Sequence, residues 1–169
     1  TDEEAQKYIN ESGIKDIVDR AASKVYVARP ANGISFTDDD VIGFETIVGK
    51  IGVSNNFKLI GIGDGATFIN QNLTSYMNFV SGLALINPAQ GQEVKVSVPT
   101  YLVTDDQAVI NSYVKANNAG KVKDGYYENP ESHYEIVVVN SDTKTSAADA
   151  TKDAWNTVLE KFGRIGNYS

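Results

Sequence analysis

Apolar residues recur at helical spacing in several parts of the chain, and these stretches predict helices. The expected helices cover residues 2–22, a segment that follows Thr37 and ends near Ile51, residues 66–80 and residues 106–116. A final helix should open at Ser146 and carry Trp155, Val158, Leu159 and Phe162 on one face. Gly13 should break or kink the first of them, because glycine destabilises a helix interior. Thr37 with Asp40, and Ser146 with Asp149, have the spacing of N-terminal capping pairs.

Short runs of β-branched and other apolar residues alternate with these helices and predict strands. We expect five strands, at residues 24–29, 57–62, 83–87, 97–104 and 134–140, and a polar loop over 117–132. The alternation predicts right-handed crossovers and a three-layer α/β fold with a mostly parallel five-stranded sheet. Strand 57–62 is apolar almost throughout, so it should be central, flanked by 24–29 and 83–87. Residues 1–169 should form a single domain.

Charge and composition exclude several classes of function. With 22 acidic and 15 basic side chains, the formal net charge is −7, which is poorly suited to binding nucleic-acid phosphates or an anionic membrane. We expect no membrane span, because the sequence has no apolar run of the necessary length. Cysteine is absent, which excludes disulfides, thiolate nucleophiles and cysteine-ligated zinc, and the only histidine is His133.

The turn after strand 57–62 is a candidate functional loop, because residues 61–65 (GIGDG) join a strand to a helix. A dinucleotide site would use Gly61, Gly63 and Ala66, but the acidic residue expected about 20 positions later is missing. Phosphate could bind at the helix N-terminus, but the carboxylate of Asp64 would repel it. Asp64 could itself be a nucleophile, as in some dehalogenases, but that chemistry still needs a histidine base.

Residues 61–65 resemble most closely G-x-S-x-G, the nucleophile elbow of the α/β-hydrolases, with Gly63 in place of serine. Gly61 and Gly65 are the small residues that such a strained turn requires. The upstream segment VYVARPANG, the downstream segment SVPTYLVTDDQAV and the closing helix DAWNTVLEKFGR resemble parts of the polyhydroxybutyrate depolymerase and feruloyl esterase branch. The resemblance spans residues 24–164 and implies a truncated α/β-hydrolase-like fold that starts midway through the family's domain.

The resemblance assigns a position in this chain to each member of a catalytic triad. The nucleophile position is Gly63, which has no side chain to attack a substrate. The acid position is Asp105 or Asp106, although capping of the following helix is the simpler role for either. The histidine should lie within residues 140–148, which contain none, whereas His133 precedes the last strand, at its opposite end from the turn.

Metal binding, glycoside hydrolysis and aromatic recognition are further possibilities. The acidic clusters at 37–40 and 104–106 could bind calcium, but they stand at predicted helix starts, where carboxylates complement the helix dipole. No EF-hand spacing occurs, and we expect no metal site. Nothing in the sequence marks a carboxylate pair for glycoside hydrolysis. Tyr126, Tyr127 and Tyr134 could form a surface that binds a sugar or a protein, or could simply anchor a loop.

These observations favour a chain without catalytic activity of its own. We expect a non-catalytic, α/β-hydrolase-like binding or structural module that uses no cofactor. The resemblance implies that it is one module of a longer bacterial extracellular or cell-surface protein. Its partner would be another domain of that protein, a polysaccharide or a protein ligand. The alternative is an esterase or depolymerase whose catalytic residues are completed by another segment or chain.

Overall fold

The structure of the chain is a computed structural model, which describes residues 2–20, 28, 30, 32–51, 57–76, 80–89, 94 and 96–160. Most of the strand expected at 24–29 and the buried position of Phe162 lie outside the described residues. The helix expected to reach residue 80 is described only as far as Tyr76, and Val80 begins a strand instead.

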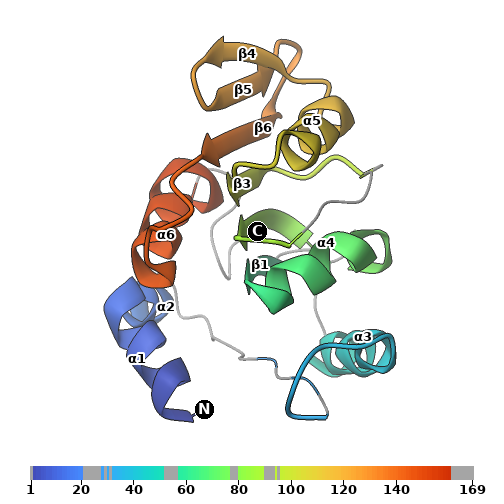
Figure 1. The fold of residues 1–169 in the computed structure, drawn as a ribbon, viewed down its shortest axis with the longest axis vertical. Coiled ribbons are helices and arrows are strands. Elements are labelled where there is room, and N and C mark those ends of the chain that lie inside the picture. Colours follow the sequence, from blue (N-terminus) through green and yellow to red (C-terminus); the bar gives the residue numbers. More distant parts are fainter. Residues whose placement is uncertain are drawn as a thin grey trace.

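The described part of the chain contains one mixed six-stranded sheet, in the order β1-β2-β3-β6-β5-β4 (Figure 1). Four strands are parallel, namely β1 (Phe57–Ile62), β2 (Val80–Ile86), β3 (Thr100–Val103) and β6 (Ser132–Asn140). The expectation of an α/β fold with a mostly parallel sheet is therefore confirmed. Within the described sheet β1 is an edge strand that pairs with β2, and its other predicted neighbour, 24–29, falls outside the description.

The loop expected over 117–132 is instead an antiparallel hairpin that extends the sheet beyond β6. It consists of β4 (Gly120–Lys123) and β5 (Tyr126–Asn129), and β5 pairs with β6. Every residue of β4 is exposed, so the strand carries no apolar alternation from which it could be predicted. The sequence feature that indicates this hairpin is the dipeptide Asp124-Gly125, which is typical of tight turns between antiparallel strands. Gly125 has the positive φ, +72°, that such a turn requires.

The helices follow the predicted pattern, with boundaries set by caps and glycines. They are α1 (Asp2–Ser12), α2 (Ile14–Arg20), α3 (Asp39–Ile51), α4 (Asp64–Tyr76), α5 (Gln107–Ala116) and α6 (Ala147–Ala154), which continues as a π-helical turn, η1 (Trp155–Leu159). Gly13 separates α1 from α2 with a φ of +76°, as expected. The backbone N–H of Thr37 donates to the Asp40 carboxylate at 2.8 Å, and Ser146 Oγ accepts from the Asp149 N–H at 3.1 Å.

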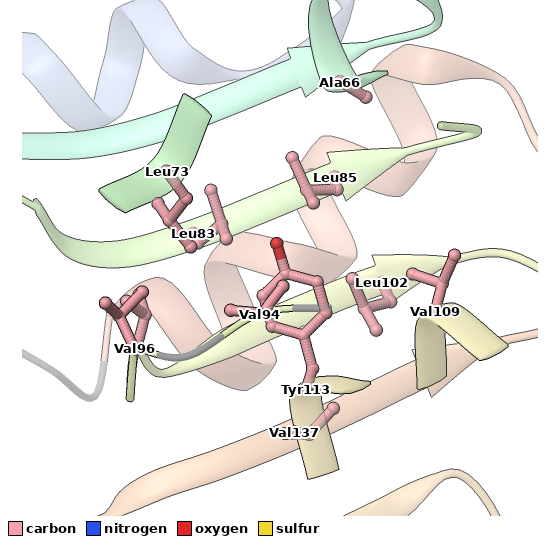
Figure 2. Close-up of a cluster of buried hydrophobic side chains, with 11 residues drawn as sticks. Ala66, Leu73, Leu83, Leu85, Val94, Val96, Leu102, Val109, Tyr113 and Val137 are labelled. Carbon is pink, nitrogen blue, oxygen red and sulfur yellow. The ribbon is translucent and has the colours of Figure 1, made fainter. Parts of the chain in front are cut away.

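The two faces of the sheet are buried against different helices. One face packs against α4 and α5 through a cluster in which the Tyr113 ring lies among Leu83, Leu85 and Leu102 (Figure 2). The opposite face packs against α6 and η1, and residues that alternate with the first set along the strands point to it, Ala84 and Ile86 among them. Helix α1 lies beside α6, outside the sheet (Figure 1). The sheet is thus the middle of three layers.

Candidate functional site

The turn at Gly63 has a left-handed backbone conformation between a strand and a helix. Strand β1 ends at Ile62, α4 begins at Asp64, and Gly63 between them has a φ of +57°. Its N–H donates to the carbonyl oxygen of Ile86 at the end of β2 at 2.8 Å, and its carbonyl accepts the N–H of Thr67 at 3.0 Å. The turn is therefore held on one side by the neighbouring strand and on the other by its own helix.

The three glycines of the turn meet different steric constraints. A Cβ on Gly61 would lie 2.7 Å from the Cα of Ala66, so no larger residue fits without moving α4. A Cβ on Gly63 would meet no atom within 4 Å, and only the positive φ favours glycine there. A Cβ on Gly65 would make an ordinary contact of 3.7 Å with the Phe36 ring. Close packing therefore requires glycine only at position 61.

Asp64 connects the turn to the segment that precedes α3. Its Oδ2 accepts a hydrogen bond from the backbone N–H of Phe36 at 3.0 Å. The Phe36 ring stacks on Phe68 of α4, with 4.9 Å between ring centroids. Asp64 is also the first residue of α4, where a carboxylate complements the positive end of the helix dipole. The arrangement gives this carboxylate a structural role.

The predicted acid residues follow β3 and stand at the start of α5. Asp106 is the N-cap of α5, and its Oδ1 accepts the N–H of Ala108 at 2.9 Å. The Asp106 N–H in turn donates to the Oγ1 of Thr104 at 3.0 Å. Asp105 is exposed to solvent. The simpler interpretation of Asp106, as a helix cap, is thus confirmed.

Polar side chains of α4 and at the carboxyl ends of the other parallel strands also bond to loop backbone. Asn87, after β2, has a φ of +55°, and its Nδ2 donates to the carbonyl oxygen of Thr143 at 3.1 Å. The Oγ1 of Thr67 accepts the N–H of Ala89 at 2.7 Å. Asn140, at the end of β6, accepts the N–H of Asp142 at 2.9 Å. These side chains hold the loops along the carboxyl ends of the parallel strands.

The sequence has no histidine after β6, where the resemblance to a hydrolase would require one. His133 is the second residue of β6, and β6 is parallel to β3, so His133 lies at the amino end of the parallel strands and Gly63 at the carboxyl end. Its side chain lies outside the described part of the structure. Residues 141–146, which follow β6, contain no histidine. The structure therefore separates His133 from the turn along the sheet.

The three tyrosines that could form a binding surface do not share one face. Tyr126 packs against the cluster under α6 and η1, whereas Tyr127 packs against the cluster under α4 and α5. Tyr126 also lines a hollow of about 390 Å³ with Lys123, whose Nζ lies 5.7 Å from the centre of its ring. Tyr134, on β6, is 71% exposed. A single surface made by all three side chains is not formed.

Among the described residues, no group of three or more histidine, aspartate or glutamate side chains could hold a metal ion. The helices in that part of the chain are also too short or too polar to cross a membrane.

Comparison with known proteins adds no relative from which a function could be transferred. No protein-family model, curated protein or solved structure matches the chain. The candidate site is therefore interpreted from the residues and geometry of this chain alone.

Proposed function

We propose that this chain is a non-catalytic, α/β-hydrolase-like module that binds or supports a partner. The observation that carries the proposal is the strand-to-helix turn at Gly63, whose φ of +57° would suit the central position of a nucleophile elbow. A serine hydrolase needs a nucleophile with a base in hydrogen-bond reach, and glycine supplies neither a hydroxyl nor any other reactive group.

The geometry of the turn supports its interpretation as a relic of an elbow. A nucleophile elbow is a sharp strand-to-helix turn in which the central residue is strained. The φ of +57° at Gly63 and the close approach of Gly61 to Ala66 have these properties. The open space at Gly63 means that a side chain could fit there, so the loss of the nucleophile is not explained by crowding.

The hydrogen bonds around the turn also favour a structural role. A catalytic edge presents side chains toward a substrate, whereas the side chains of Asp64, Asn87 and Asp106 each bond to the protein backbone. The chain order of the triad, nucleophile then acid then histidine, would require a histidine after β6. That segment has only polar residues without an imidazole.

The partner that we propose is another domain of the same bacterial extracellular or cell-surface protein, or a polysaccharide or protein ligand. The exposed ring of Tyr134 and the hollow beside Tyr126 are the features that favour recognition of a ligand. Aromatic side chains contribute large contact areas at a low entropic cost, which suits both sugar and protein surfaces.

Ester hydrolysis under steady-state conditions tests the proposal. We expect purified protein to show no sustained release of p-nitrophenol from p-nitrophenyl acetate or butyrate beyond the buffer rate and the stoichiometric acylation of its own amines. The matched control is Gly63→Ala, which changes the same position without supplying a hydroxyl. Continuous turnover by the wild type that this variant abolishes would show that the turn is catalytic.

A further inference from the structure

A second chemical feature lies at the opposite end of the parallel strands from Gly63. The Nζ of Lys58, near the start of β1, donates a hydrogen bond to the Oγ of Ser81 on β2 at 2.8 Å. The hydroxyl of Ser81 donates to the carbonyl oxygen of Phe57 at 3.3 Å. An amine is therefore held in a defined position against a hydroxyl group.

The absence of a side chain at Gly82 leaves space on the sheet for the aliphatic part of Lys58. Lys58 is aligned with Gly82 in the parallel register of β1 and β2. A Cβ at position 82 would lie 3.3 Å from the Cδ of Lys58 and 2.9 Å from the Cδ2 of Leu159 in η1. Glycine at this position leaves the space in which the aliphatic stem runs over the strand. The stem is thereby placed on the face of the sheet that η1 covers.

Partial burial changes the acid–base chemistry of this amine. The side chain is half-buried, and loss of solvent lowers the pKa of Lys58 to about 8. An ordinary lysine has a pKa of about 10.4, so only about one amine in a thousand is neutral at pH 7.5. At a pKa of about 8, roughly a quarter would be neutral at the same pH. The neutral amine is the nucleophilic form.

We propose that Lys58, positioned by Ser81 over Gly82, is an amine nucleophile that accepts acyl groups from small acyl donors with a good leaving group. In this step the lone pair of Nζ attacks the carbonyl carbon and a C–N bond forms. The bond from that carbon to the leaving oxygen breaks, and the leaving group departs with the electron pair. The nitrogen loses one proton to water, and the product is a stable amide. This site is independent of Gly63 and of the proposed function.

Competitive acetylation of the wild-type protein tests the assignment. The protein is treated with less than one equivalent of p-nitrophenyl acetate between pH 6.5 and 10, and acetylated peptides are quantified by mass spectrometry. Lys144, an exposed lysine in the loop before α6, is the internal reference. We expect Lys58 to react faster than Lys144 at pH 7.5, because loss of solvent leaves a larger share of the Lys58 amine in the neutral, nucleophilic form. The rate at Lys58 should level off above about pH 9, where its amine is almost entirely neutral.

Three outcomes would overturn the proposal. The first is a Lys58 rate at or below that of Lys144 across the pH range. The second is a Lys58 rate that rises without levelling up to pH 10. The third is acetyl found on Ser81 as an ester that hydroxylamine removes, because the hydroxyl would then be the nucleophile. Lys58→Arg keeps the positive charge and should abolish the fast phase while leaving acetylation of Lys144 unchanged. Because the wild type alone decides the question, poor folding of this variant would not obscure the result.

Discussion

The carboxylate of Asp64 accepts the backbone N–H of Phe36 at 3.0 Å, across 28 positions of sequence. This bond joins the segment before α3 to the first turn of α4, beside the stacked rings of Phe36 and Phe68. It explains an acidic residue in the GIGDG turn without any catalytic role.

Replacement of Asp64 tests this connection. We expect Asp64→Ala to lower the free energy of unfolding by about 1 kcal/mol, because a hydrogen bond to a charged acceptor at an exposed helix start is lost. Amide hydrogen exchange should accelerate at Phe36 in the variant. Asp64→Asn, which retains an acceptor oxygen, should preserve most of the protection. Equal exchange at Phe36 in the wild type and Asp64→Ala would mean that the bond does not hold the segment.

The glycines of the turn offer a matched pair of substitutions. Gly61→Ala should destabilise the protein by about 1–3 kcal/mol, since its Cβ would lie 2.7 Å from the Cα of Ala66. Gly65→Ala, inside α4 with an ordinary contact to Phe36, should be neutral or stabilising by up to about 1 kcal/mol. Urea unfolding of the two variants measures the difference. Equal effects would contradict the close packing of β1 against α4.

Gly63→Ser separates backbone strain from close contact at the same turn. We expect a loss of about 1 kcal/mol, because a Cβ at φ +57° is strained while the space around it is open. The melting temperature should fall by about 4 °C, within the range expected for a domain of this size. A fall several times larger would show that Gly63 contacts another backbone or a ligand, and the interpretation as a relic turn would be wrong.

A buried polar pair links the two helices on one face of the sheet. Tyr113 of α5 donates its hydroxyl to the Oδ1 of Asn70 of α4 at 2.6 Å, and both residues are buried. Tyr113→Phe should cost about 1–3 kcal/mol, because it leaves the buried Asn70 carbonyl without this donor. Adding Asn70→Leu should cost less than the sum of the two single changes, since both partners are then removed. Chemical denaturation of the four proteins in this cycle gives the coupling energy, and strict additivity would contradict it.

Local signals in the sequence account for much of the fold. Gly13, the cap at Asp106 and strand 57–62 are all where the sequence predicts them, because each depends on neighbouring residues. The strand expected at 97–104 is shorter, at Thr100–Val103. Val96 and Val98 alternate and are buried, but this segment is held by side-chain hydrogen bonds at the end of α5. The Oγ of Ser97 donates to the Oδ1 of Asn117, the C-cap of α5, at 3.0 Å. The alternation of apolar residues at 96 and 98 therefore reflects burial of their side chains and not pairing with a neighbouring strand.

Features that depend on register or on distant contacts could not be predicted. The approach of Lys58 to Ser81 requires the alignment of two parallel strands, which hydrophobic pattern does not specify. The hydrogen bond from the Phe36 N–H to Asp64 depends on the path of the segment that precedes α3, which local sequence does not specify. Tyr126 and Tyr127 are adjacent in sequence but pack on opposite faces, because successive side chains alternate along β5. Placing these two side chains on their correct faces would have required strand β5, which the sequence did not predict.

Labelling with a serine-reactive fluorophosphonate tests the absence of a catalytic serine most directly. The wild-type protein and Gly63→Ser are treated with the probe, and labelled residues are identified by mass spectrometry. The account predicts no stoichiometric labelling of any serine in either protein, because Gly63 offers no hydroxyl and no imidazole follows β6 to activate a new one. Labelling of the introduced hydroxyl in Gly63→Ser alone would reveal a base that remains in place from a recently disabled enzyme. Stoichiometric labelling of one serine in the wild type would contradict the account outright.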